Sequence, residues 1–116
     1  MDTNIIKKKK NNNKYALILH YVDWCHYCHD FLPIFEDIKN NNNNNNIQFY
    51  KVNHTNDQVV IDSSKLIVDI SLDNIDSFPT IIFYDGIRNK FTKYNKERDE
   101  KTIIKFINKK IKKNNK

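Results

Sequence analysis

The sequence lacks any apolar run close to the about 20 residues that a membrane-spanning helix needs, so no membrane partner is expected. It also lacks a convincing secretory signal, because no small-residue cleavage site follows the basic stretch Lys7–Lys10 and the apolar residues after it. These absences predict a cytoplasmic or other intracellular protein. With two cysteines in 116 residues, the chain holds one cysteine pair. In a reducing compartment such a pair is more often catalytic or metal-binding than structural.

Basic charge is scarce in the middle of the chain, although the formal net charge is +6. Lys7–Lys10 and the stretch from Lys109 to Lys116 hold nine of the twenty basic residues, whereas residues 14–108 hold 11 basic and 13 acidic ones. No specific nucleic-acid partner is therefore expected. We predict a disordered basic, asparagine-rich leader at 1–13, one monomeric domain at 14–111 with a modest core, and a basic tail at 112–116.

The first half of the chain predicts a strand, a helix and a second strand. Tyr15–Val22 is an almost continuous apolar run, typical of a strand buried on both faces. After it, apolar residues recur at helical spacing, which predicts an amphipathic helix that begins near Cys25. These residues are Phe31, Ile34, Phe35 and Ile38. The asparagine-rich stretch 40–46 is expected to be a loop, and Ile47–Asn53 a strand parallel to the first, since a helix joins the two.

The second half predicts a hairpin and a closing helix. Residues 57–76 are ambiguous, with apolar residues that suggest a helix of uncertain bounds. Pro79–Tyr84 and a second run at 87–94 flank Asp85-Gly86, which favours a two-residue type I′ turn. Between Ile103 and Ile111 the apolar spacing is helical, with acidic residues before it and lysines after it. The order β-α-β-(α)-β-β-α indicates an α/β fold, one sheet with helices on both faces.

Both cysteines lie in the motif Trp24-Cys25-His26-Tyr27-Cys28, where the first strand runs directly into the helix. Cys25 is expected at the helix N-terminus, where unpaired N–H groups and the helix dipole lower the pKa of a thiol. A protonated His26 acts in the same direction. Cys28 lies one turn further in and is expected to be more buried. Cys25 is thus the predicted attacking thiolate and Cys28 the resolving thiol.

The pattern C-x-x-C-H permits two other uses of the cysteines. Haem attachment needs the five residues from Cys25 to His29, with His20 or His54 as a second iron ligand. A zinc site would take Cys25, Cys28, His29 and His54, without the second paired motif that makes such sites recognisable. Export normally accompanies c-type haem, and no export signal is visible. A reversible disulfide needs neither a metal nor a cofactor.

Taken together, these residues resemble the thioredoxin superfamily over about residues 14–111. The resemblance rests on the motif WCHYC, on Pro33 five residues after it, and on Phe78-Pro79-Thr80 before a strand. It implies a thioredoxin-like fold, with a central mixed sheet flanked by helices on both faces, and a thiol–disulfide oxidoreductase without a cofactor. The implied partners are protein disulfides, bound transiently as mixed disulfides, and a reductase or oxidase.

The resemblance also implies roles for individual residues. Cys25 and Cys28 match the redox pair, and Trp24 matches the tryptophan that borders it and contacts substrate. Pro79 matches the cis-proline of the family, an isomer that its surroundings must hold. Phe78, which precedes it, is then expected to offer its backbone to an extended substrate by strand addition.

One departure from the family pattern concerns proton transfer. The family's buried acid, which takes a proton from the second cysteine, is replaced by Leu19, so Lys51 is expected to lack its acidic partner. His20, His29 and His54 are candidates for a substitute. This departure keeps open a further class, a thioredoxin-fold binding module with little turnover.

A second departure is the dipeptide between the cysteines. His26-Tyr27 is neither the Gly-Pro of typical thioredoxins nor the Gly-His of protein disulfide isomerases. A tyrosine directly before the second cysteine, here Tyr27, resembles the motif of glutaredoxins. A histidine beside the thiolate stabilises the reduced form. We therefore predict a reduction potential above the thioredoxin value of about −270 mV, towards the isomerase value of about −180 mV.

Overall fold

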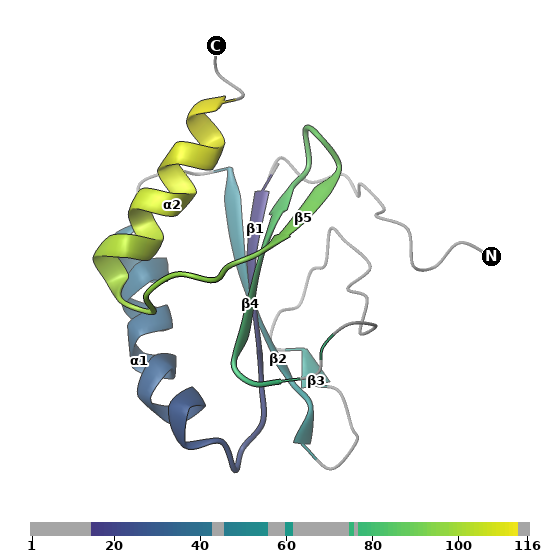
Figure 1. Cartoon of the computed structure of the whole chain (residues 1–116), viewed down its shortest axis with the longest axis vertical. Helices are drawn as coiled ribbons and strands as arrows, with labels where there is room; N and C mark the ends of the chain where they lie inside the picture. The colour runs from purple at the N-terminus through teal and green to yellow at the C-terminus, as the bar shows by residue number, and fades with distance from the viewer. Residues whose placement is uncertain (1–14, 43–45, 56–59, 62–74, 76, 114–116) are drawn as a thin grey trace, which may run out of the picture.

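The chain forms a mixed sheet with two long helices packed on it (Figure 1). The computed structural model describes residues 15–42, 46–55, 60–61, 75 and 77–113. The strand order is β3-β2-β1-β4-β5; β2 runs parallel to β1 and all other neighbours are antiparallel. In chain order the elements are β1 (Tyr15–Tyr21), α1 (His26–Asn41), β2 (Ile47–Asn53), β3 (Val60–Ile61), β4 (Thr80–Asp85), β5 (Lys90–Lys93) and α2 (Glu100–Lys113).

β1 lies at the centre of the sheet because its sequence is apolar on both faces. The residues from Tyr15 to His20 are all buried. β2 pairs with β1 in register from Tyr15↔Ile47 to Tyr21↔Asn53, and β4 pairs on the other side. A strand that alternated polar and apolar residues would suit a half-solvated position instead. The predicted doubly buried strand is confirmed, one residue shorter at its end.

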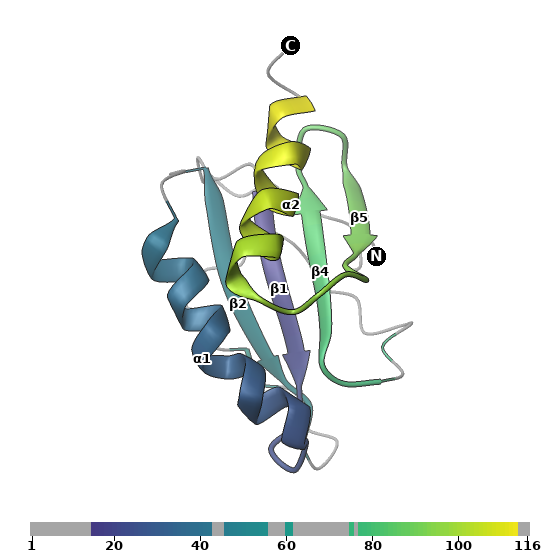
Figure 2. The ribbon, with the colours of Figure 1, turned by 60° about the vertical axis from the view of Figure 1, so that its left-hand side comes forward.

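Both described helices cover the same face of the sheet, as Figure 2 shows. Leu17 and Leu19 of β1 point to this face, since alternate residues of a strand face opposite sides. The buried helical residues that pack with them are Phe31, Phe35, Ile38, Ile103, Ile107 and Ile111. A second cluster, which includes Ala16 and Ile18, lies on the opposite face. The predicted amphipathic pattern of both helices is therefore confirmed.

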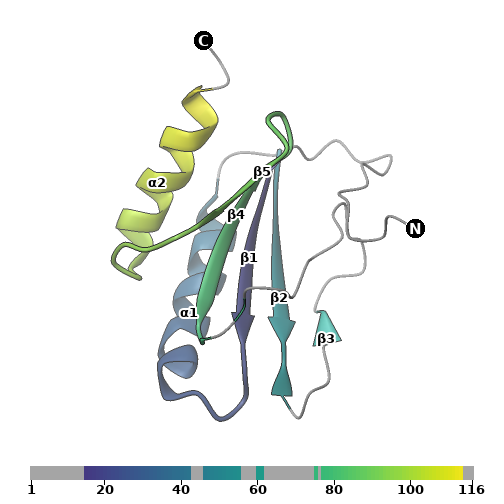
Figure 3. The same cartoon turned by 45° about the vertical axis from the view of Figure 1, so that its right-hand side comes forward.

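The segment predicted as an additional helix differs from expectation where the structure describes it. Val60 and Ile61 form β3, which pairs antiparallel with Val52 and Asn53 at the end of β2 (Figure 3). A helix is thus wrong at these two β-branched residues, whose type favours a strand. The rest of 57–74 lies outside the described residues, so helical cover of the second face stays a prediction.

The hairpin between β4 and β5 is present, but its turn is longer than predicted. Asp85 pairs with Lys90, so the turn comprises the four residues 86–89. Asp85 Oδ1 accepts hydrogen bonds from the backbone N atoms of Ile87 at 3.0 Å and Arg88 at 3.1 Å. Asn89, with φ of 58°, takes the left-handed conformation, whereas Gly86 does not. The two-residue type I′ turn is wrong because the Asp85 side chain stabilises an Asx-type turn instead.

The end of α1 takes in part of the asparagine-rich stretch. The helix continues through Asn40 and Asn41, so the expected loop at 40–46 is shorter than predicted. Asn41 Nδ2 donates to Glu100 Oε2 at 2.7 Å. This hydrogen bond joins the last residue of α1 to the first residue of α2. At its own end α2 continues through Lys113, two residues into the predicted basic tail.

α2 begins at Glu100 because the preceding Asp99 caps it. Asp99 Oδ1 accepts from the backbone N of Thr102 at 2.8 Å, and Oδ2 accepts from the Thr102 hydroxyl at 2.9 Å. These hydrogen bonds, the backbone one above all, hold the pKa of Asp99 below its usual value. A side-chain oxygen at this position satisfies an N–H group that the helix itself leaves unpaired.

We expect Asp99→Ala to lower the melting temperature by about 4 °C or more, because the helix loses its N-cap. Thermal unfolding followed by circular dichroism at pH 7 measures the change. Asp37→Ala, which removes an exposed carboxylate from the middle of α1, is the control and should leave the melting temperature within about 2 °C. Equal melting temperatures for wild type and Asp99→Ala would contradict the capping role.

Candidate active site

Cys25 and Cys28 form a disulfide at the start of α1, with their Cα atoms 5.1 Å apart. Cys25 is the N-cap: its backbone is extended, and its Sγ accepts a hydrogen bond from the backbone N of Cys28 at 3.1 Å. Cys25 is 8% exposed and Cys28 0%. The more exposed sulfur therefore lies where N–H groups of the first helical turn point, an environment that stabilises a thiolate. In Figure 2 this corner lies where β1 ends and β4 begins.

The loop between β1 and α1 is held by residues at the end of β2. The Asp23 carboxylate accepts from Asn53 Nδ2 at 2.8 Å, and the Asp23 backbone N donates to Thr55 Oγ1 at 2.7 Å. Thr55 donates in turn to Asn53 Oδ1 through its backbone N at 3.0 Å and through its hydroxyl. From α1, His29 Nε2 donates to the Asp23 carbonyl oxygen. Two segments, the end of β2 and the first turn of α1, thus fix the backbone directly before the cysteine pair.

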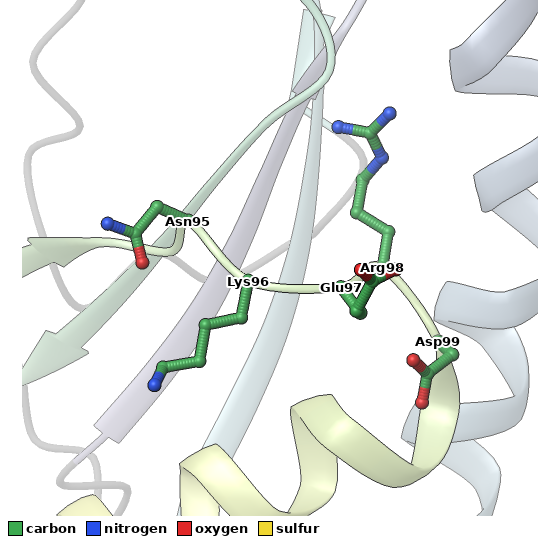
Figure 4. A pocket seen from close by; sticks show the side chains of 5 residues that line it. All are labelled: Asn95, Lys96, Glu97, Arg98 and Asp99. Atoms are coloured by element: carbon green, nitrogen blue, oxygen red, sulfur yellow. The ribbon is translucent and has the colours of Figure 1, made fainter.

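Two exposed aromatic side chains belong to the disulfide motif, one directly before each cysteine in the sequence. Trp24 is 73% exposed and Tyr27 is 63% exposed. The guanidinium carbon of Arg98 lies 5.9 Å from the centre of the Tyr27 ring, within cation–π range. Arg98 belongs to the segment between β5 and α2, which borders a hollow of about 670 Å³ (Figure 4). The residues that line it are Asn95, Lys96, Glu97, Arg98 and Asp99. A hollow with charges of both signs therefore adjoins the disulfide motif.

His26 lies on the solvent side of the first helical turn. Its Nε2 is 3.6 Å from Asp30 Oδ2, and the two side chains are 83% and 66% exposed. His26 thus has an acidic neighbour one turn along the helix, in a solvated position where such a pair contributes little. The spacing of four residues between His26 and Asp30 is the sequence signal for this pair, because it puts both side chains on one face of the helix.

The turn before β4 lies beside the disulfide. The Phe78–Pro79 peptide bond is cis, the isomer that the resemblance implied. Phe78 packs against the cluster of Val22, Cys25 and Cys28. The Thr80 hydroxyl, at the start of β4, donates to the Ser77 carbonyl at 2.6 Å. Residues more than 50 positions apart in the sequence thus meet at one end of the sheet.

Lys51 has an acidic partner that the sequence analysis did not find. Leu19 is fully buried and pairs with Lys51 across β1 and β2. Lys51 Nζ lies 2.9 Å from Glu36 Oε2, with the two side chains 23% and 40% exposed. Lys51 thus lacks the acid of the family pattern, as expected from Leu19, and pairs instead with Glu36, because a turn of α1 packs over β2 and supplies a different carboxylate. The packing of helix on strand decides this pair, and sequence spacing carries no signal for it.

Two of the four histidines form a hydrogen-bonded pair. His20 is fully buried at the end of β1, and its Nδ1 lies 2.8 Å from Nε2 of His54. Burial first, and the neighbouring His54 second, lower the pKa of His20 from its usual 6.5 to about 4. Burial also lowers the pKa of His54. Both rings are thus neutral at pH 7, and one donates the N–H that the other accepts.

The three histidines considered as substitutes for the buried acid have other partners. His20 and His54 bind each other, and His29 binds the Asp23 carbonyl. Within the described part of the chain, no hydrogen bond joins any of them to Cys28. The hypothesis of a histidine directly replacing the acid therefore has no contact to support it.

The residues named for a zinc site are not assembled as one. Cys25 and Cys28 are bonded to each other, while His29 and His54 have separate partners. Among residues 15–42, 46–55 and 77–113, no group of three or more metal-ligating side chains is close enough to hold an ion.

Neither described helix is long and apolar enough to cross a membrane.

The chain is similar to known proteins along most of its length. A family model described as Thioredoxin matches residues 2–109. A protein disulfide-isomerase of Schizosaccharomyces pombe is 31% identical over 110 residues, which cover 92% of this chain and 28% of that protein. The chain thus spans little more than a quarter of the length of this curated relative.

Solved structures show the same fold. The J-Trx1 fragment of ERdj5 matches with a TM-score of 0.65 and 16% identity, over 96% of this chain and 53% of that one. The first thioredoxin domain of mouse protein disulfide-isomerase A4 matches with a TM-score of 0.60 and 20% identity, over 83% and 62%. The predicted thioredoxin-like fold is therefore confirmed.

Proposed function

The chain belongs to the thioredoxin family, and from this premise we propose that it is a thiol–disulfide oxidoreductase acting on protein disulfides through Cys25 and Cys28. The observation that carries the proposal is the Cys25–Cys28 disulfide at the N-terminus of α1, where Cys25 Sγ accepts a hydrogen bond from a helix N–H. Geometry and family point to the same chemistry. They support it over haem attachment and over a zinc site.

Reduction of a substrate would take two exchange steps. The Cys25 thiolate attacks one sulfur of the substrate disulfide, forming a mixed disulfide and releasing the other substrate sulfur as a thiolate. The Cys28 thiolate then attacks Cys25 Sγ, which forms the Cys25–Cys28 disulfide and releases the second substrate thiolate. Two electrons pass to the substrate, and the reverse sequence forms a disulfide in it. No cofactor takes part.

The roles of the two cysteines follow from their different surroundings. Cys25 is the more exposed and its sulfur accepts a helix N–H, so it is the group that attacks substrate and carries the mixed disulfide. Cys28 is fully buried and therefore acts only after the substrate is bound to Cys25. Trp24, directly before Cys25, and Tyr27, directly before Cys28, offer exposed aromatic surface. Phe78 would offer its backbone to an extended substrate segment.

We expect a reduction potential between about −270 and −180 mV. The first helical turn stabilises the Cys25 thiolate and hence the reduced form, since the backbone N of Cys28 donates to Cys25 Sγ. Equilibration with glutathione buffers, followed by alkylation and mass measurement, gives the fraction of oxidised protein. A potential at or below about −270 mV would contradict the expectation and indicate a reductase resembling thioredoxin.

A second candidate is a binding module of the same fold with little turnover. Leu19 in place of the family's acid favours it. Among the described residues, no side chain that could accept a proton from the Cys28 thiol forms a hydrogen bond with its Sγ. Insulin reduction driven by dithiothreitol separates the two. A rate above that of dithiothreitol alone supports the enzyme. The background rate, together with a reducible Cys25–Cys28 disulfide, supports the binding module.

A further inference from the structure

His20 is a polar side chain in an apolar position. It is fully buried on the face of β1 that Ile18 also occupies, opposite the helices. Its neighbours across the sheet are Val52 on β2 and Thr80 on β4. Its Nε2 is buried without a hydrogen-bond partner among the described residues. A buried nitrogen left unpaired destabilises a fold, so the hydrogen bond that the other ring nitrogen makes to His54 requires an explanation.

That bond holds His54 at the end of β2. His54 Nε2 and His20 Nδ1 are 2.8 Å apart, and the ring centres are 5.0 Å apart. The backbone N of His54 donates to the Tyr21 carbonyl at 2.8 Å. Both the backbone and the ring tip of His54 are therefore tied to β1.

The ring of His54 also contacts Phe78. Their ring centres are 5.2 Å apart at an interplanar angle of 45°, the range of favourable aromatic pairs. Phe78 in turn packs against the cluster that contains Cys25 and Cys28. A continuous series of contacts thus runs from buried His20 through His54 and Phe78 to the disulfide.

We infer that His54, locked by His20, is a positioning residue that holds Phe78 beside the disulfide and thereby sets how tightly a substrate segment binds. The inference rests on the proposed function, in which the backbone of Phe78 receives that segment. The contacts of both histidines in the described residues do not include a sulfur atom. Loss of the pair should therefore weaken substrate binding and leave the redox chemistry of Cys25 and Cys28 as it is.

The test measures KM and kcat for insulin reduction driven by dithiothreitol. His54→Ala should raise KM about three- to tenfold, the size expected for one lost aromatic contact, with kcat within about twofold of wild type. The Cys25–Cys28 reduction potential, measured against glutathione, should not change. If His54 only stabilised the fold, kcat and the reduction potential would change together with KM.

The His20 side of the pair is tested by two further variants. His20→Phe keeps a ring but removes the hydrogen bond to His54, so KM should rise as in His54→Ala. His20→Asn places an amide near the position of Nδ1 and should restore KM to within about twofold of wild type. Phe91→Ala is the control, because it removes a ring contact of similar geometry, Tyr84–Phe91 at 5.0 Å, far along the sheet. It should leave KM unchanged.

The outcomes separate the two proposals. If wild type reduces insulin faster than dithiothreitol alone and His54→Ala has the wild-type KM, the positioning role is overturned and the proposed function stands. If His20→Asn raises KM as much as His20→Phe, the hydrogen bond is not what matters and the inference is overturned as well. Wild type at the background rate overturns the proposed function and, with it, the inference.

Discussion

Replacement of Cys28 by serine is expected to stop turnover and leave the protein covalently attached to its substrate. In this variant the Cys25 thiolate still attacks a substrate disulfide, since its helix N-terminus remains. The mixed disulfide then lacks the thiol that resolves it. Turnover should fall by at least about a thousandfold, as when one member of a catalytic unit is lost. Intact-mass measurement after incubation with disulfide-bonded insulin detects the adduct.

Two comparisons make this prediction specific. Cys25→Ser should lose turnover to the same extent but form no adduct, because buried Cys28 cannot reach a protein disulfide. Dithiothreitol should release insulin from the Cys28→Ser adduct, since the link is a disulfide. An adduct that forms equally well on Cys25→Ser would show that the buried cysteine attacks first and would reverse the two roles.

The second large effect is a loss of stability in mild acid that depends on His20. The folded protein holds the pKa of His20 at about 4, against 6.5 in the unfolded chain. Between these two values the unfolded chain binds more protons, so its population rises as the pH falls. The stabilisation is complete above about pH 6.5 and decreases towards pH 4. For His20 alone, the loss between pH 7 and pH 5 is about 2 kcal/mol.

Urea unfolding at pH 7 and at pH 5 measures this loss. Other groups titrate in the same interval, among them His54, whose pKa is lowered by burial and which acts in the same direction. His20→Phe therefore serves as the reference, because it keeps an aromatic ring in the same buried position and removes the titrating nitrogens. The wild type should lose about 2 kcal/mol more than this variant between the two pH values. Equal losses would contradict a buried neutral His20.

The parts of the fold that follow from local sequence were predictable. The change from a continuous apolar run to helical spacing near Cys25 places the redox motif at a strand–helix junction, and both elements have the expected extent to within a few residues. Burial of Cys28 follows from the same spacing. Such signals are readable because each depends on residues close together in the chain.

What the sequence did not reveal depends on the packing of distant segments. His20 and His54 are 34 positions apart, and Lys51 meets Glu36 only because α1 crosses β2 at a particular turn. The position of Phe78 beside the disulfide was suggested by resemblance and not by any pattern in the residues. The turn after β4 was mispredicted for a different reason, since a side-chain hydrogen bond of Asp85 outweighs the usual preference of Asp-Gly.

The hydrogen bond between Asn41 and Glu100 has a consequence for how the length of the asparagine run can change. A run of one residue type can change in length without changing its composition. Because residues 40–46 are all asparagine, a residue gained or lost anywhere in the run still leaves asparagine at the second position, where α1 presents it to Glu100. The segment between α1 and β2 takes up the difference, and each doubling of a loop's length costs only about 0.6 kcal/mol. The contact between the helices is therefore insensitive to the length of the very repeat that supplies it.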